Sequence, residues 1–210
     1  MQKKNTQNTI CLFGDSITWG AADIEKSGWG ERLRYFLANR NNGAKVYNCG
    51  ICGDNSNGLL SRFKTECEAR QPDIIFIAIG INDSQFIISQ NNVAVDIDRY
   101  SHNLHKIITQ AKQYTEKVFL LGLTDIDETR TIPVVYNEDK NYYQKNVEAY
   151  NAAAKEVSAR NGCIFIGLSG LMLAEELVDG VHPDSSGHKK IFKKIKDFIV
   201  LNKILDNSDV

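Results

Sequence analysis

The chain has 210 residues, of which 42% are hydrophobic and 24% are charged, and its formal net charge is −1. This length is enough for one well-buried core and short for two, and the composition is typical of a globular domain. The small net charge argues against a nucleic-acid-binding surface, which needs a clear basic surplus. No apolar stretch is long enough to span a membrane. We therefore expect one domain over residues 1–210, with flexible ends at 1–8 and 204–210.

The N-terminal segment and the cysteines bear on the cellular compartment. The segment contains lysines but lacks the apolar stretch of a secretion signal. The five cysteines are an odd number, and they lie mostly within apolar patterns, at positions 11, 49, 52, 67 and 163. We interpret them as reduced thiols and predict a cytoplasmic protein.

Short apolar runs along the chain predict five buried strands. In the third run the apolar residues Ile74 to Ile77 are consecutive rather than alternating. Continuous runs are typical of parallel strands that helices cover on both faces. The five runs are Thr9–Phe13, Lys45–Asn48, Asp73–Ile79, Lys117–Leu123 and Cys163–Leu168.

Helical patterns follow these runs, with apolar residues recurring at steps of three or four. The order strand–helix, repeated five times, predicts an open α/β sandwich with right-handed crossovers. In such sheets ligands bind beyond the carboxyl ends of the strands. A long connection at 124–142 is either part of a substrate-facing rim or a plain surface loop. The apolar faces are Trp29, Leu33, Phe36 and Leu37; Leu59, Leu60, Phe63 and Cys67; Ile97, Tyr100, Leu104, Ile107 and Ala111; Tyr143, Val147, Tyr150, Ala154 and Val157; and Ile191, Phe192, Ile195, Phe198 and Ile199.

The segment after the first predicted strand reads GDSITWG and starts at Gly14. It places Ser16 at the carboxyl end of a strand, where glycines let the backbone turn sharply. Taken alone, it fits an ordinary turn equally well, because Asp and Ser readily bond to nearby backbone groups.

Two more segments follow the second and third predicted strands. NCGICGD, which ends at Asp54, offers a glycine N–H to a cleft, or is simply a glycine-rich turn before a helix. GIND, which ends at Asp83, offers the side-chain NH₂ of Asn82 as a neutral donor that can stabilise an oxyanion. Its alternative reading is a helix cap.

A fourth segment, DGVH, precedes the last predicted helix. Asp179 stands three residues before His182, so its carboxylate can reach one ring nitrogen from the same loop. The other ring nitrogen is then free to face a nucleophile. Together the four segments supply a nucleophile, donors, a base and a group that orients the base, which is the set that acyl transfer needs.

In this combination the sequence resembles the SGNH hydrolases, the GDSL-type esterases and lipases. The four blocks of that family carry Ser, Gly, Asn and His, and they follow in the family's order from Phe13 to His182. The resemblance implies a flavodoxin-like three-layer α/β/α sandwich with a five-stranded parallel sheet. It also implies hydrolysis of esters, thioesters or acetylated sugars without a metal or another cofactor.

The resemblance assigns roles by position. Ser16 matches the nucleophile and His182 the general base, while Asp179 matches the group that orients His182. The N–H of Ser16, the N–H of Gly53 and the side-chain amide of Asn82 match the oxyanion hole. Two neighbouring carboxylates, those of Asp15 and Asp83, are expected to support loop geometry rather than react.

One position departs from the family pattern. Many relatives carry Ser before the glycine of the second block, whereas this chain has Cys52. The donor is a backbone group, so we expect its role to survive. The thiol is expected to narrow the pocket or to make the enzyme sensitive to oxidants.

The combined interpretation is a cytoplasmic esterase that acts on small short-acyl or acetyl esters, with no nucleic-acid partner. A thioesterase and a carbohydrate O-acetylesterase remain alternatives within the family. Outside it, we weighed a non-catalytic binding module, a redox site at Cys49 and Cys52, and a zinc site with His102 and His105. Five aromatic residues either line a pocket or fill the core, and the core is favoured for Trp29 and Tyr143; the other three are Trp19, Tyr136 and Tyr142.

Overall fold

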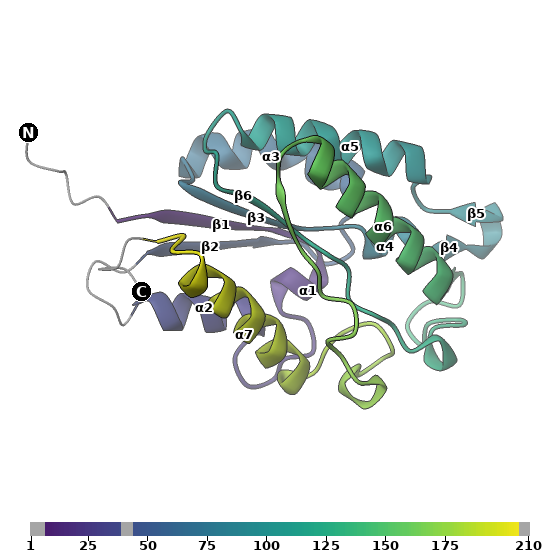
Figure 1. The fold of residues 1–210 in the computed structure, drawn as a ribbon. Coiled ribbons are helices and arrows are strands. Elements are labelled where there is room, and N and C mark those ends of the chain that lie inside the picture. The colour runs from purple at the N-terminus through teal and green to yellow at the C-terminus, as the bar shows by residue number, and fades with distance from the viewer. Residues whose placement is uncertain (1–6, 39–43, 206–210) are drawn as a thin grey trace, which may run out of the picture.

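The computed structural model describes residues 7–38 and 44–205 and has a parallel sheet at its centre (Figure 1). Its five strands lie in the order β2-β1-β3-β6-β8, and every neighbouring pair is parallel. The five apolar runs form these strands, which confirms that prediction. The strands are β1 (Thr9–Gly14), β2 (Lys45–Gly50), β3 (Ile74–Ala78), β6 (Val118–Leu121) and β8 (Ile164–Ile166).

Helices cover both faces of the sheet, which confirms the three-layer α/β/α architecture (Figure 1). Helices α2 (Gly28–Ala38) and α7 (Ser185–Leu201) pack together on one face. On the other face lie α3 (Ser56–Arg70), α5 (Ile97–Ala111) and α6 (Gln144–Arg160). Residues 74–77 of β3 are all buried because both faces of the strand are covered.

The first three strands end level with one another at the edge of the sheet. Gly14, the last residue of β1, pairs with Gly50 of β2 and with Ala78 of β3. A Cβ at Gly14 would lie 2.4 Å from the carbonyl oxygen of Ala78, so only glycine allows this close approach. Two short helices follow, α1 (Ser16–Trp19) after β1 and α4 (Ile81–Ser84) after β3. Residues that are far apart in the sequence thus lie at the same carboxyl edge of the sheet.

A second, three-stranded antiparallel sheet was not predicted from the sequence. Its strands lie in the order β5-β4-β7 and are only two residues long. A strand this short shows no alternating pattern in the sequence. The three strands are β4 (Phe86–Ile87), β5 (Asn92–Val93) and β7 (Lys140–Asn141). The chain also has short 3-10 helices in its described part: η1 (Ile88–Gln90), η2 (Glu128–Arg130) and η3 (Ala174–Glu176).

The prediction for Tyr143 was wrong. Helix α6 begins at Gln144, so Tyr143 is its N-cap and is half-buried, with its ring against that of Phe86. The residue before it, Tyr142, is 2% exposed and belongs to the core. Trp29 is buried, as predicted.

The ends of the chain are described only in part. Residues 1–6 of the predicted leader and 206–210 of the predicted tail lie outside the described residues. Leu205 falls within the predicted tail but is buried in the core. Within the described ranges, none of the helices combines the length and the apolar character needed to cross a membrane. All five cysteines are free thiols, and only Cys52 is exposed.

Candidate active site

A serine, a histidine and an aspartate form a continuous chain of hydrogen bonds at the carboxyl edge of the sheet. The Oγ atom of Ser16 lies 2.8 Å from Nε2 of His182. Nδ1 of the same ring lies 2.7 Å from Oδ2 of Asp179. When Nδ1 carries the proton and donates it to the carboxylate, Nε2 is left as the acceptor that faces the hydroxyl group. The side chains that the sequence analysis singled out thus meet across 166 positions of the sequence.

The carboxylate of Asp179 organises its own loop as well as the histidine. Its Oδ1 accepts hydrogen bonds from the N–H groups of Val181 at 3.0 Å and His182 at 2.8 Å. Burial acts to raise the pKa of Asp179, but the hydrogen bonds from His182 outweigh it and lower the pKa to about 2. The group is therefore ionised at neutral pH and suited to stabilise a protonated imidazole.

The loop that carries the histidine is held by the long connection at 124–142, here called the β6–α6 connection. The carbonyl of Gly180 accepts from the N–H of Asp127 at 2.8 Å, and Arg130 donates to the carbonyl of Val178 at 3.3 Å. Gly180 has φ +88°, and a Cβ there would lie 2.7 Å from Cγ2 of Thr131. One backbone and one side-chain hydrogen bond thus hold the loop that carries His182 against the connection.

Ser16 begins helix α1, which Asp15 caps. The Asp15 carboxylate accepts a hydrogen bond from the N–H of Ile17 at 3.0 Å. Ser16 is the first residue of the helix, so its own N–H has no intrahelical partner. It remains available as a donor beside the Oγ atom. Ser16 is 7% exposed, so its hydroxyl is largely buried.

Asn82 presents its amide from α4 with both ends engaged. Its Nδ2 donates to the carbonyl of Asp54 at 2.9 Å, and its Oδ1 accepts from the hydroxyl of Tyr142 at 2.7 Å. The amide nitrogen has two hydrogens, so one remains for a further acceptor. The contact with Tyr142 was not foreseen, since Tyr142 was considered only as a pocket or core residue.

Gly53 lies in the turn after β2, with φ +76° and open space where a side chain would be. In the described part of the chain no acceptor is found for its N–H. The next residue, Asp54, is fixed on one side by Asn82 and on the other by Arg62, which donates to its carboxylate at 2.9 Å. The N–H of Gly53 is therefore a free donor in a turn that the contacts of Asp54 hold in place.

Arg62 ties the ends of two strands together, a role that the sequence analysis missed. Its guanidinium donates to the carbonyl of Gly14 at 3.1 Å and to that of Cys49 at 2.9 Å. These carbonyls lie at the ends of β1 and β2. A lone arginine in a helical pattern carries no signal for such contacts.

The two neighbouring carboxylates bond to backbone groups. Both oxygens of Asp83 accept from the N–H of Ser56, at 3.1 and 3.0 Å, which joins α4 to the start of α3. Burial raises the pKa of Asp83 to about 6 and that of Asp15 to about 7. Asp179, by contrast, bonds to a histidine ring.

Comparison with known proteins identifies the family of this chain. Residues 12–190 match the model of the GDSL-like lipase/acylhydrolase family. The chain belongs to this family. It is therefore a hydrolase of the GDSL (SGNH) esterase class, as the sequence resemblance predicted.

Two curated relatives of this GDSL-family hydrolase are esterases. The chain is 24% identical to the esterase TesA of Pseudomonas aeruginosa over 89% of its own length and 85% of that protein. It is 24% identical to an acetylxylan esterase of Geobacillus stearothermophilus over 70% of its length and 68% of the relative.

Solved structures share the fold. A lipase/acylhydrolase from Enterococcus faecalis superposes with a TM-score of 0.74 at 23% identity, covering 93% of this chain and 97% of that one. The Geobacillus stearothermophilus acetylxylan esterase gives a TM-score of 0.73 at 20% identity, covering 90% of this chain and 93% of that one.

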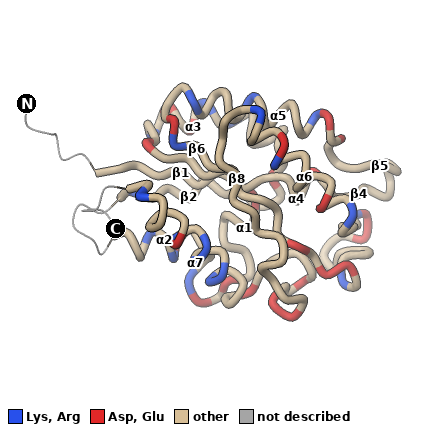
Figure 2. Tube along the Cα trace, in the orientation of Figure 1, with Lys and Arg blue, Asp and Glu red and all other residues tan. Residues whose placement is uncertain are grey.

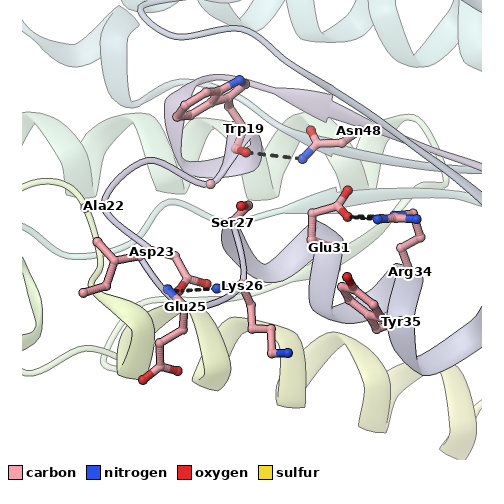
Figure 3. Close-up of a pocket in the computed structure, with 12 residues that line it drawn as sticks. Trp19, Ala22, Asp23, Glu25, Lys26, Ser27, Glu31, Arg34, Tyr35 and Asn48 are labelled. Carbon is pink, nitrogen blue, oxygen red and sulfur yellow. Dashed lines mark hydrogen bonds and ion pairs between the residues drawn. The ribbon is translucent and has the colours of Figure 1, made fainter.

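In the GDSL-family hydrolase a cavity of about 660 Å³ is lined by the end of α1, the loop at 20–27 and α2 (Figure 3). Trp19, which follows Ser16 on α1 and is 56% exposed, forms part of its wall. Tyr35 lies on the opposite side, with Lys26 and Arg34 each 5.3 Å from the centre of its ring. Ser16, Asp179 and His182 do not line this cavity.

The alternative redox and zinc sites considered from the sequence can be compared with the structure of this family member. Cys49 is buried and Cys52 exposed, and they form no disulfide. The Nδ1 atom of His105, on α5, lies 2.7 Å from Oδ1 of Asn161. Among the residues that the structure describes, no three His, Cys, Asp or Glu side chains are grouped so that they could hold a metal ion.

Charged groups also lie on the elements around the site. Figure 2 shows Lys and Arg mainly along the outer helices, while Asp and Glu recur on loops at the carboxyl edge of the sheet. These loops include residues 125–128, 138–139 and 175–179. The ring of Tyr136 lies 6.2 Å from the imidazole of His182, centre to centre.

Proposed function

We propose that this hydrolase cleaves small carboxylic esters with acetyl or other short acyl groups, through an acyl-enzyme on Ser16. The observation that carries the proposal is the hydrogen-bonded series Ser16–His182–Asp179, with contacts of 2.8 and 2.7 Å. A serine hydroxyl is a weak nucleophile until an adjacent base takes its proton, and this arrangement supplies the base.

Acylation uses His182 first as a base and then as an acid. Nε2 accepts the Ser16 proton while Oγ bonds to the acyl carbon, whose carbonyl becomes a tetrahedral oxyanion. The protonated imidazole then gives this proton to the departing alcohol oxygen as the carbon–oxygen bond breaks, which leaves the acyl group on Ser16. A water molecule then attacks the acyl carbon and gives a proton to His182. His182 returns this proton to Oγ of Ser16 as the bond to Oγ breaks, and the carboxylic acid is released.

Charge of opposite sign develops at two places: an acceptor faces the imidazolium, and donors face the oxyanion. The ionised Asp179 stabilises the imidazolium through its contact with Nδ1. The N–H groups of Ser16 and Gly53 and the free hydrogen of the Asn82 amide supply the oxyanion hole. Preorganised donors of this kind commonly make the largest single contribution to catalysis.

The substrate class is tested with a panel. Nitrophenyl esters of rising acyl length are assayed beside acyl-CoA thioesters and acetylated sugars, with Ser16→Ala as the paired variant. We expect the acetyl and other short-chain esters to give the highest kcat/KM, and Ser16→Ala to lose this activity. Equal turnover by Ser16→Ala contradicts the mechanism, and a clear preference for acyl-CoA contradicts the substrate class.

Acetylated carbohydrates are the second candidate, since one curated relative is an acetylxylan esterase. The exposed Trp19, three residues after Ser16 on α1, offers an aromatic surface at the 660 Å³ cavity. Higher kcat/KM for acetylated xylooligosaccharides than for nitrophenyl acetate favours this candidate.

A binding module on the same fold is distinguished by chemistry rather than affinity. A fluorophosphonate reacts only with a serine that is activated as a nucleophile. We expect labelling of the wild-type chain and none of Ser16→Ala. An unlabelled wild-type chain contradicts an enzymatic role for Ser16.

A further inference from the structure

The amide of Asn82 has two possible orientations, and only one of them serves the reaction. A carboxamide is nearly symmetric in shape, but one end donates and the other accepts. With Nδ2 toward the substrate it stabilises an oxyanion; with Oδ1 there it repels the charge. Something must therefore select the orientation.

Two contacts make that selection. The carbonyl of Asp54 can only accept, so it requires the NH₂ end, and it lies 2.9 Å from Nδ2. The other end faces the Tyr142 hydroxyl, which donates to Oδ1 at 2.7 Å. Asn82 is 6% exposed, so water has little access to replace either partner.

Tyr142 is itself placed with little freedom. It is 2% exposed, and burial keeps its pKa well above the ordinary value, so its hydroxyl remains a donor at neutral pH. Its N–H donates to the carbonyl of Thr131 at 3.0 Å, and its carbonyl accepts from the Thr131 hydroxyl at 2.9 Å. The preceding residue, Asn141, pairs with Phe86, which lies four positions after Asn82.

We propose that Tyr142 is a positioning residue of the oxyanion hole, which holds the Asn82 amide with its free N–H aimed at the substrate oxygen. The β6–α6 connection thereby has a defined function, since it carries this hydroxyl to a residue 60 positions away. The inference deepens the proposed esterase function and rests on it for the catalytic readout.

The first test is Tyr142→Phe, which removes the hydroxyl and keeps the ring in the core. We expect kcat for nitrophenyl acetate to fall about tenfold with KM unchanged, less than the roughly 10²–10³ that loss of a whole donor typically costs. The rate of fluorophosphonate labelling falls in parallel. The matched control is Tyr143→Phe, whose hydroxyl contacts Asn141 and not Asn82, and which keeps wild-type kcat. A Tyr142→Phe variant with wild-type kcat overturns the proposal.

A double-mutant cycle separates positioning from general destabilisation. In the Asn82→Ala background, Tyr142→Phe has nothing left to position, so we expect it to lower kcat less than twofold further. Two residues that act independently give additive effects. A further tenfold loss in this background shows that Tyr142 acts elsewhere and overturns the proposal.

A measurement that needs no turnover tests the positioning role of Tyr142 separately from the proposed esterase function. The side-chain NH₂ resonances of Asn82, assigned by their loss in Asn82→Ala, are followed by ¹⁵N NMR. We expect them to shift and broaden in Tyr142→Phe and to stay in place in Tyr143→Phe. Unmoved resonances overturn the positioning role even if the enzyme is an esterase. A shift in a chain that hydrolyses no ester supports the contact and refutes the proposed function.

Discussion

The two halves of the candidate active site are built in different ways. Ser16, Gly53 and Asn82 follow the ends of three paired strands, and Gly14, Gly50 and Ala78 stand in register directly before them. Asp179 and His182 instead lie on a loop before α7, next to exposed apolar residues such as Val178. The strand-end half is set by the sheet. The loop half is set by contacts with the β6–α6 connection.

This difference shows which half of the site can move without unfolding the core. The register of a parallel sheet cannot shift by a fraction of a residue, so donors at strand ends keep their spacing unless the sheet unfolds. A loop held by a few hydrogen bonds, such as that from Asp127 to Gly180, can move while the core stays intact. Substitutions in the connection are therefore expected to change catalysis more than stability.

The largest effect is expected in the loop half, at Asp179→Asn. The neutral amide cannot hold an imidazolium or fix the ring tautomer, so kcat falls by about 10⁴, the loss measured for the matching change in the serine protease triad. Thermal unfolding monitored by circular dichroism is the control for folding. A loss below tenfold in a folded variant contradicts the orienting role.

The next largest effect is expected in the strand-end half, at Asn82→Ala. Removing the amide donor lowers kcat by about 10²–10³. KM stays nearly constant because the lost hydrogen bond strengthens only as charge develops. Steady-state kinetics with nitrophenyl acetate measures both constants. A variant that changes KM alone shows that Asn82 binds substrate rather than the oxyanion.

A smaller effect is expected at Gly180→Ala, which tests the contact between the loop that carries His182 and the β6–α6 connection. The added Cβ would meet Cγ2 of Thr131 at 2.7 Å and shift His182 away from Ser16. Such a displacement costs up to about 10² in kcat. Gly170→Ala is the matched control, because Gly170 also has a positive φ, +73°, but nothing lies within 4 Å of its Cβ position. Equal losses in both variants show that backbone strain, not the contact, is responsible.

The smallest effect on catalysis is expected at Asp15→Asn, where the readout is stability against pH. Burial raises the pKa of Asp15 from 3.8 to about 7. Between these values the folded chain holds more protons than the unfolded one, so stability falls as the pH rises.

The slope from this group is at most about 1.4 kcal/mol per pH unit. Asparagine still caps α1 but does not ionise, so urea unfolding of Asp15→Asn is expected to show a flatter fall between about pH 4 and pH 7. Parallel curves for the wild type and the variant contradict the buried-carboxylate account.

Sequence patterns predicted the strand-end half well for a physical reason. Strands covered on both faces must be continuously apolar, so residues 74–77 mark β3 and place Asn82 just beyond it. Asp179 and His182 were found because they are close in sequence and match a known block. Neither route reaches Tyr142, whose partner Asn82 is 60 positions away. Strands β4 and β7 pair with each other and so bring the segments after Asn82 and before Tyr142 together, but they are too short to leave a sequence pattern.

The account depends most directly on where the acyl group goes. Reaction of the enzyme with an acetyl ester is quenched in acid within one turnover, and the digested peptides are examined by mass spectrometry. The account predicts one added acetyl group, on Ser16 alone, and none in Ser16→Ala. An acetyl group on another residue, or full turnover without any acetylated peptide, would contradict it.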